Sequence, residues 1–319
     1  MDHPEASTKV NNSVCIHSNQ LSRKFRKQIA VDCLNLTIPN GELFGLVGPD
    51  GAGKTTILRL LAGLLHISSG EATVLGYDLK RESDLIKKET GYMAQQFSLY
   101  GELSVEENLL FFSDLFDVDP VIRKDRMKKL LAFAGLTQFQ KRPAALLSGG
   151  MQKKLALACT MIHEPKLLLL DEPTTGVDPI SRREFWDILS ELHLQGTTII
   201  VSTPYMDEAD RCSRVGLLFQ GKLVECASPT DIRAMLPGEL IEIIPDDWQK
   251  ATEILSQASN IKEVQTYGET IRVLVDSAEK QQKKIERSLI NAGIQIRLIR
   301  KAPAKMEDAF ISLIGKLEG

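Results

Sequence analysis

Residues 43–65 read LFGLVGPDGAGKTTILRLLAGLL, and this stretch decides the fold. It opens with a short apolar strand, Leu43 to Val47, passes through a glycine-rich loop, and ends in a segment whose apolar residues recur at helical spacing. The loop from Gly48 to Thr55 matches the whole pattern GxxxxGK[ST] of a phosphate-binding loop. Strand, loop and helix in this order predict an α/β domain that holds the phosphates of a nucleotide.

The parts of this loop have different tasks. Its glycines let backbone N–H groups wrap a phosphate, Lys54 offers a positive charge to it, and the Thr55 hydroxyl is suited to Mg²⁺. The residues expected to bind nucleotide here are Gly48, Pro49, Asp50, Gly51, Ala52, Gly53, Lys54, Thr55 and Thr56.

A second motif follows about a hundred residues later, where the apolar run Leu167 to Leu170 ends in Asp171 and Glu172. An apolar strand that ends in acidic residues is common and means little alone. After a phosphate-binding loop it predicts that Asp171 supports the Mg²⁺ shell and that Glu172 polarises an attacking water.

Between these motifs lies the run Leu147-Ser148-Gly149-Gly150-Met151. At the start of a helix, a serine hydroxyl, unobstructed backbone N–H groups and the positive end of the helix dipole suit an anion. The chain already has one complete phosphate cradle, so the second anion site is expected to serve the nucleotide of another chain. The sequence therefore predicts a dimer that closes over ATP.

With its motifs in this order, the chain resembles the nucleotide-binding subunit of an ABC transporter over about Val14 to Ala227. The resemblance implies ATP and Mg²⁺ as ligands and ATPase activity. It implies that Phe25 stacks on adenine, although Phe25 alone would be interpreted as a core aromatic. It also implies that Gln95, in the run GYMAQ at 91–95, lies near Mg²⁺ and the membrane subunit, and that Asp178 belongs to the loop coupling the two sites of the dimer.

The implied roles fall into three groups. The catalytic residues are Glu172, Gln95 and Lys54, and the Mg²⁺ ligands are Thr55, Gln95 and Asp171. The contacts to the γ-phosphate of the opposing subunit are Ser148, Gly149 and Gly150.

The amino-acid sequences of the motifs resemble those of one branch of the family. GPDGAGKTT, LSGGM, GVDPISRR and the tail MEDAF are similar to the export branch, which moves drugs, lipids or polysaccharides through a separate membrane subunit. The resemblance implies a cytoplasmic protein, peripheral on the inner face of the cell membrane through its permease. Its partners would be this permease and a second ABC subunit, identical or related.

Three residues depart from the family pattern. Met151 replaces a glutamine and cannot make the hydrogen bonds of an amide. Asp50 places a carboxylate near the expected γ-phosphate. Pro204 occupies the position of the switch histidine, so the γ-phosphate loses one donor. This loss leaves an alternative open: a regulatory, weakly hydrolytic or binding-only cassette.

The pattern along the chain predicts three parts. Residues 1–13 are expected to be a disordered tail, and 14–237 an ABC ATPase domain with an N-terminal antiparallel β subdomain and a helical subdomain at about 96–160. After Pro237 and Gly238, residues 238–319 predict a small ferredoxin-like α+β module with a regulatory or dimer-supporting role.

Composition excludes some partners. The chain has 39 Lys and Arg against 42 Asp and Glu, a net charge of −3, which argues against nucleic acid as a partner. No apolar run approaches the roughly 20 residues that span a bilayer. A soluble ABC protein of translation or DNA repair would usually have two cassettes or a long coiled insertion, and neither is found.

Overall fold

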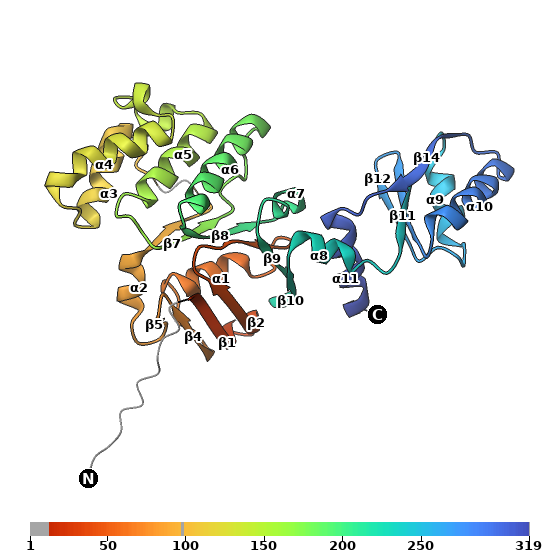
Figure 1. Cartoon of the computed structure of the whole chain (residues 1–319), viewed down its shortest axis with the longest axis horizontal. Helices are drawn as coiled ribbons and strands as arrows, with labels where there is room; N and C mark the ends of the chain where they lie inside the picture. Colours follow the sequence, from red (N-terminus) through yellow and green to blue (C-terminus); the bar gives the residue numbers. More distant parts are fainter. Residues whose placement is uncertain (1–12, 97–98, 319) are drawn as a thin grey trace, which may run out of the picture. The chain divides into compact units, whose positions relative to one another are not determined.

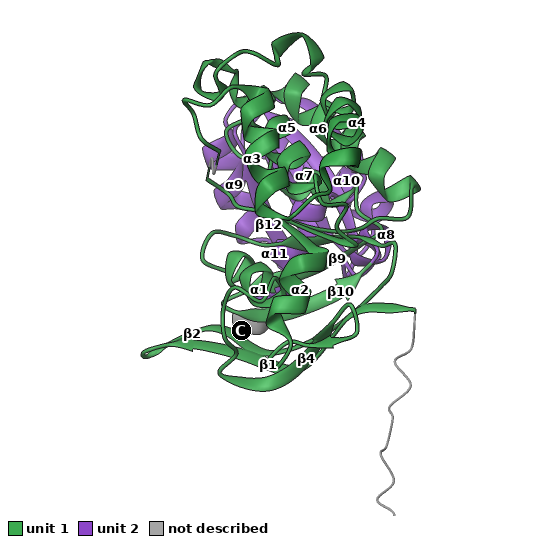
Figure 2. Cartoon of the chain, turned by 90° about the vertical axis from the view of Figure 1, so that its left-hand side faces the viewer, with its two compact units in different colours: residues 1–227 green, residues 228–319 purple. Residues whose placement is uncertain are grey.

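The computed structural model describes residues 13–96 and 99–318 (Figure 1). Nearly all of the expected N-terminal tail thus lies outside the described residues. The chain divides into two compact units, residues 1–227 and 228–319 (Figure 2). The predicted boundary at 237 was too late, because α8 (Pro229–Ala234) begins after its N-cap Ser228 and contacts α11 (Met306–Glu318). Pro229 starts a helix here, as proline does at a first helical position.

A six-stranded sheet is the centre of the first unit. Its order is β10-β9-β3-β8-β7-β6, and every neighbouring pair except β9 and β10 is parallel. The strands are β3 (Leu43–Val47), β6 (Thr90–Met93), β7 (Leu167–Asp171), β8 (Thr198–Thr203), β9 (Arg214–Phe219) and β10 (Lys222–Ala227). The carboxyl ends of β3, β7 and β8 meet at one edge, where ligands bind in such sheets.

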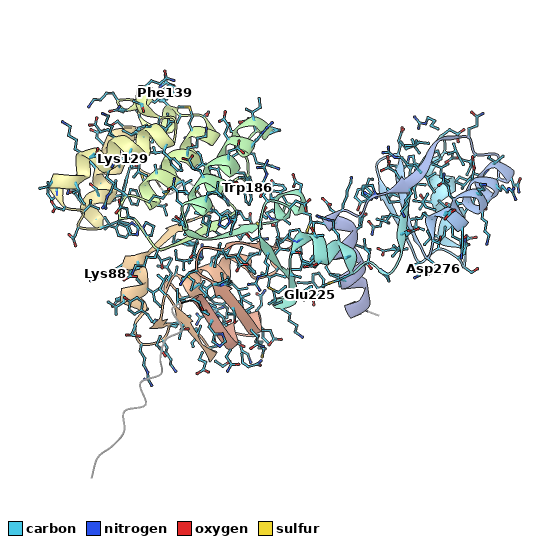
Figure 3. The ribbon with its side chains drawn as sticks, in the orientation of Figure 1. Lys88, Lys129, Phe139, Trp186, Glu225 and Asp276 are labelled. Atoms are coloured by element: carbon cyan, nitrogen blue, oxygen red, sulfur yellow. The ribbon has the colours of Figure 1, made fainter. Side chains whose placement is uncertain are left out.

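Helices cover this sheet, as expected of the predicted α/β domain. Helix α1 (Lys54–Leu61) contacts β7 and β8. Helix α5 (Gly149–Thr160) contacts β6, and α6 (Pro179–Leu194) contacts β8. Trp186 on α6 is fully buried (Figure 3). The strands β3, β7 and β8 are buried along their whole length, as expected of a parallel sheet covered on both faces.

The predicted N-terminal β subdomain is a second, antiparallel sheet of order β2-β1-β4-β5. Its strands are β1 (Val14–Phe25), β2 (Gln28–Pro39), β4 (Ser69–Val74) and β5 (Tyr77–Asp78), followed by α2 (Ser83–Glu89). The apolar pattern of β4 is weak, because only Ala72 and Val74 of this strand are buried. Both sheets share one apolar core, in which Leu21 of β1 and Phe44 of β3 are members.

The predicted helical subdomain is confirmed. It contains α3 (Val105–Leu115), α4 (Pro120–Phe133), two short 3₁₀ turns at Thr137–Phe139 and Ala144–Leu146, and α5. A capping box begins α3: Glu107 N–H donates to Ser104 Oγ at 3.2 Å, and Ser104 N–H donates to Glu107 Oε2 at 2.7 Å.

The second unit has the predicted ferredoxin-like order. After α8, its elements are β11 (Glu239–Pro245), α9 (Trp248–Ser256), β12 (Glu263–Tyr267), β13 (Thr270–Val275), α10 (Ala278–Asn291), β14 (Ile296–Ala302) and α11. The sheet is antiparallel, with order β12-β13-β11-β14. Helices α9 and α10 pack on it over a core of its own. In the described part of the chain, no helix is long and apolar enough to cross a membrane.

Candidate nucleotide site

The phosphate-binding loop joins β3 to α1 at the ligand-binding edge of the large sheet. Gly53 is the N-cap of α1 with φ +104°, and a Cβ there would lie 2.4 Å from the carbonyl oxygen of Ala30. Only glycine satisfies both conditions. The first turn of α1 carries no acidic residue, so the positive end of its dipole is unopposed. The loop therefore fits the negative charge of a phosphate.

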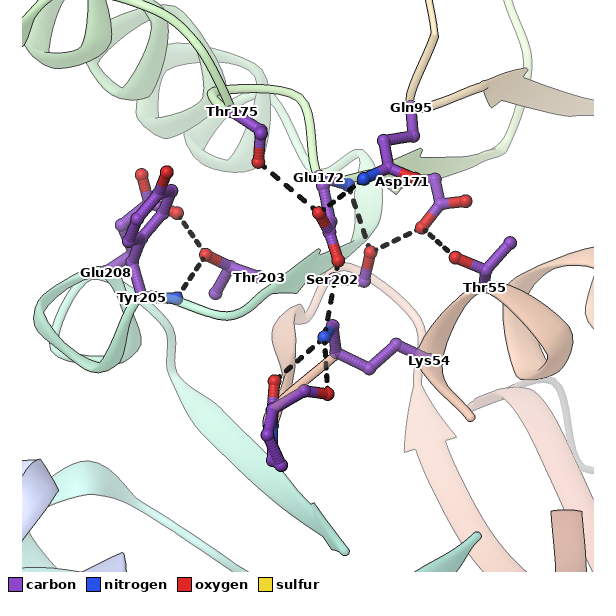
Figure 4. Close-up of polar contacts among 12 residues, drawn as sticks. Lys54, Thr55, Gln95, Asp171, Glu172, Thr175, Ser202, Thr203, Tyr205 and Glu208 are labelled. Atoms are coloured by element: carbon purple, nitrogen blue, oxygen red, sulfur yellow. Dashed lines mark hydrogen bonds and ion pairs between the residues drawn. The ribbon is translucent and has the colours of Figure 1, made fainter. Parts of the chain in front are cut away.

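Lys54 lies under this loop with 3 % of its surface exposed. Its ammonium group donates to the carbonyl oxygens of Gly48 at 2.8 Å and Pro49 at 3.0 Å, and lies 3.3 Å from Glu172 Oε1 (Figure 4). A cation held between the loop and the second motif is placed to exchange these oxygens for those of a phosphate.

Asp171 joins three elements. Its Oδ1 accepts from the hydroxyls of Thr55 at 3.0 Å and Ser202 at 2.7 Å, and its Oδ2 accepts from Tyr92 at 3.3 Å. Burial raises the pKa of Tyr92, which keeps that phenol a donor. A buried carboxylate beside a threonine hydroxyl is an oxygen set that suits Mg²⁺, which binds through one or two carboxylates together with substrate phosphates.

The backbone of Glu172 is in the left-handed region, with φ +46°, and the residue is only 5 % exposed to solvent. Such backbone strain concentrates at functional sites. Besides Lys54, its carboxylate accepts from Gln95 Nε2 at 2.8 Å and from the Thr175 hydroxyl at 3.4 Å (Figure 4). Gln95 follows β6 and is held in turn, since Lys153 Nζ donates to its carbonyl oxygen at 2.7 Å. Burial lowers the pKa of Lys153.

A pocket of about 420 Å³ opens over these groups, within the usual size range of ligand sites. Phe25 lies at its wall and is 42 % exposed, so the interpretation as a core aromatic was wrong. The Arg23 guanidinium lies 4.5 Å from the centre of the Phe25 ring. The other lining residues are Gln28, Ala30, Asp50, Gly51, Ala52, Gly53, Lys54, Thr55, Thr56, Gln95 and Glu172.

A larger pocket, of about 760 Å³, lies between α3 and α4. None of the predicted site residues lines it. The smaller pocket is therefore the candidate site, because it alone of the two combines the phosphate-binding loop with the acidic strand end.

The residues expected to act on another chain's nucleotide are absent from the lining of this pocket. Ser148 is the N-cap of α5, and Asp178 is the N-cap of α6. These two helix starts are adjacent, because a Cβ on Gly150 would lie 2.4 Å from the Cβ of Ser181. Hydrogen bonds from the Ser181 N–H and hydroxyl hold the pKa of Asp178 below its ordinary value.

Sequence reasoning missed several contributors to the site. Gln28 and Ala30 come from β2. This strand is separated in sequence from the phosphate-binding loop, and no motif indicates that the two lie together. Ser202 could have been found, because it is the last residue but one of β8, the strand that follows β7 along the chain. In the parallel register Ser202 is the partner of Asp171, so the two side chains end at the same edge.

Comparisons with known proteins agree with this geometry. A family model described as "ABC transporter" matches residues 31–175. The Nod factor export ATP-binding protein I of Sinorhizobium fredii is 35 % identical, with 98 % of this chain and 91 % of that protein covered. A protein named probable multidrug ABC transporter ATP-binding protein YbhF, from Escherichia coli, is 43 % identical over 69 % of this chain. The chain spans only 38 % of YbhF's length.

Solved structures are similar to the first unit. The structure of cbiO1 from Clostridium perfringens, described as part of the ABC transporter complex cbiONQ, has a TM-score of 0.65 and 26 % identity, covering 70 % of this chain and 92 % of that one. The ATP-binding cassette MJ0796, in a dimeric post-hydrolysis state bound to ADP and Pi, has a TM-score of 0.60 and 25 % identity, covering 67 % and 98 %.

Proposed function

Because the chain belongs to the ABC transporter family, we propose that it is an ATP-binding subunit that couples ATP binding and hydrolysis to export through a separate membrane permease. One observation carries the proposal: Lys54 and Thr55 of the phosphate-binding loop contact Glu172 and Asp171 at one edge of the sheet. The names of relatives, which include a Nod factor export protein and a linearmycin resistance protein, favour the export branch.

Each group then has a role in hydrolysis. ATP would place its phosphates in the loop and Lys54 Nζ would turn from Glu172 to them. Glu172, released from that ion pair, would accept a proton from the attacking water while Gln95 orients its carboxylate. Thr55, Asp171 and Gln95 would hold Mg²⁺, which neutralises charge on the phosphates. Phe25 would stack on the adenine.

The proposal includes a dimer. Ser148, Gly149 and Gly150 lie outside their own chain's pocket, and Ser148 begins α5 with backbone N–H groups suited to an anion. They would contact the γ-phosphate bound by a second subunit, identical or related, and the loop at Asp178 would couple the two sites.

The proposal also covers the contact with the permease and the role of the second unit. The helical subdomain and the Gln95 loop would contact the permease, which would hold the chain on the cytoplasmic face of the membrane. The second unit has no phosphate-binding loop, so we assign it a regulatory or dimer-supporting role. The comparisons give no support to the alternative of a regulatory or binding-only cassette.

Trapping tests the proposal. Glu172→Gln should abolish steady-state ATPase activity yet give an ATP-dependent dimer in size-exclusion chromatography with light scattering. Lys54→Ala should lose ATP binding, whereas Lys166→Ala, which removes an exposed lysine paired with Glu89, should behave as the wild type. A wild-type chain that forms the ATP dimer unaided and never hydrolyses ATP would favour the binding-only alternative.

Copurification tests the partner. An epitope-tagged full chain extracted in mild detergent is expected to bring down an integral membrane protein. Recovery of the chain without any membrane protein would contradict a permanent permease subunit.

A further inference from the structure

Glu208 is a buried carboxylate beside the site that the motif analysis did not single out. It lies on α7 (Met206–Ala209) and is 2 % exposed. Its Oε1 accepts from the Thr174 hydroxyl and its Oε2 from the Thr203 hydroxyl, both at 2.6 Å. Arg182 Nε lies 3.7 Å from Oε1. Figure 4 shows Glu208 beside Thr203 at the end of β8.

Two of these partners lie next to residues of the nucleotide site. Thr174 is two residues after Glu172, and its neighbour Thr175 donates to the Glu172 carboxylate. Thr203 follows Ser202, whose hydroxyl donates to Asp171 at 2.7 Å and accepts from the Glu172 N–H at 3.0 Å. Each carboxylate oxygen of Glu208 thus accepts a hydrogen bond from a segment that also contacts Glu172.

The third partner belongs to the start of α6. Arg182 is in its first turn, and its backbone N–H donates to the carbonyl oxygen of Asp178 at 2.9 Å. The Arg182 guanidinium also stacks on the ring of Tyr205, 4.2 Å from its centre. Glu208 is therefore connected to the Asp178 loop as well as to the loop that carries Pro204.

We propose that Glu208 is a positioning residue for ATP hydrolysis, which clamps the segment after Glu172, the segment around Pro204 and the start of α6 into one arrangement. The inference rests on the proposed function. Pro204 has no N–H and no polar side chain, so it cannot anchor its own loop. The loop is anchored instead by Thr203, which donates to Glu208 and accepts the Tyr205 N–H at 3.1 Å.

The clamp acts on chemistry through geometry. A carboxylate that has to accept a proton from water must be held within hydrogen-bond reach of that water. Glu208 does not touch the pocket, whose lining contains neither Glu208 nor its three partners. Its loss should therefore affect turnover and leave ATP binding nearly unchanged.

The main variant is Glu208→Gln in the full chain, since the amide keeps the volume but offers only one acceptor oxygen and no charge for Arg182. We expect kcat to fall about 10-fold to 10²-fold, as misplacement of groups around a reacting centre does. The Kd for a fluorescent ATP analogue should stay within about twofold of wild type, because a group outside the pocket contributes to catalysis rather than to binding.

Glu42→Gln is the matched control. Glu42 is also a buried carboxylate, 9 % exposed, and pairs with Arg214 at 2.8 Å, but it precedes β3 at the edge opposite the phosphate-binding loop. Its kcat should remain that of the wild type even if its melting temperature falls.

Thr174→Val and Thr203→Val each remove one hydroxyl donor to Glu208 and carry the test if Glu208→Gln does not fold. Each should lower kcat in the same direction but less than Glu208→Gln, with Kd unchanged.

An unchanged kcat in a folded Glu208→Gln variant, or in both valine variants, would overturn the role of Glu208 and leave the proposed function standing. A parallel loss of ATP affinity and kcat would overturn it too, because that is the result of a purely structural contact. A wild-type chain that binds no ATP overturns both the clamp and the proposed function.

Discussion

At the scale of single residues, the central feature of the site is the set of oxygens that the Lys54 ammonium contacts. Its ammonium lies almost fully buried between two loop carbonyls and the Glu172 carboxylate. A buried cation needs such partners, because an unpaired charge away from water is costly. In the proposed function, phosphate oxygens would replace these partners, so that nucleotide binding would release Glu172 from Lys54.

Pro204 gives the clearest prediction at this scale. Pro204→His would return a donor to the loop between β8 and α7, and we expect kcat for ATP to rise by about 10²-fold to 10³-fold, the range over which one preorganised donor acts. Steady-state phosphate release with the membrane partner present measures this. If the wild-type rate is already fast and the variant leaves it unchanged, another residue supplies the contact.

At the scale of elements, the packing of α5 on α6 depends on one glycine of the pair at the start of α5. A Cβ on Gly150 would lie 2.4 Å from the Cβ of Ser181, whereas a Cβ on Gly149 would meet nothing closer than the Gly176 carbonyl oxygen at 3.8 Å. The two positions are adjacent in sequence and both lie in the first turn of α5, so they form a matched pair that differs in burial.

Alanine should therefore act differently at the two glycines. Gly150→Ala should lower the free energy of unfolding by about 1–3 kcal/mol, because the new methyl forces α5 from α6. Gly149→Ala should be neutral or stabilise by up to about 1 kcal/mol through helix propensity. Urea unfolding of both variants measures the difference. Equal effects would contradict this account of the packing.

His163 makes the stability of the helical subdomain depend on pH. It follows α5, stacks on Phe116 at the end of α3 with ring centres 3.8 Å apart, and burial lowers its pKa to about 4. The unfolded histidine gains its proton near pH 6.5, whereas the folded one stays neutral until about pH 4. Between these values the unfolded state binds more protons, so stability falls as the pH falls.

The measurement compares slopes. The melting temperature of the wild type should fall more between pH 7 and pH 4.5 than that of His163→Phe, which keeps an aromatic ring against Phe116 but does not titrate. Parallel curves for the two proteins would show that His163 contributes nothing to the acid sensitivity.

At the scale of the whole molecule, each of the two units has its own core. In the second unit, Arg272 and Asp308 form an ion pair at 3.2 Å with side chains only 2 % and 1 % exposed. Breaking a buried pair by removing one partner costs about 3–5 kcal/mol, because the other charge remains buried. No residue of the nucleotide pocket belongs to this unit.

Asp308→Ala should therefore lower one of two calorimetric unfolding transitions and leave the other, and the affinity for ATP, unchanged. Glu269→Gln is the control in the same unit, since its pair with Arg297 is exposed and such pairs contribute about 0–1 kcal/mol. A single transition that shifts as a whole would mean that the units unfold together.

The sequence alone determined much of this protein, because the decisive signals are local. A glycine-rich loop between an apolar strand and a helix requires neighbouring residues only. The spacing of apolar residues predicted the α/β domain, the helical subdomain and the ferredoxin-like second unit. The boundary expected at 237 lies inside the second unit, because Pro229 starts a helix that packs on α11.

Only the tertiary structure decided which distant residues surround the chemistry. The strand register places Ser202 beside Asp171. Gln28 and Ala30 line the pocket from the other sheet. Glu208 accepts hydrogen bonds from two threonine hydroxyls that are about thirty residues apart in the sequence. These contacts are separated along the chain by amounts that no periodicity encodes. The contacts of Ser202 and Glu208 exist because the carboxyl ends of parallel strands converge at one edge of the folded sheet. Gln28 and Ala30 reach the pocket because the antiparallel sheet packs on the same core.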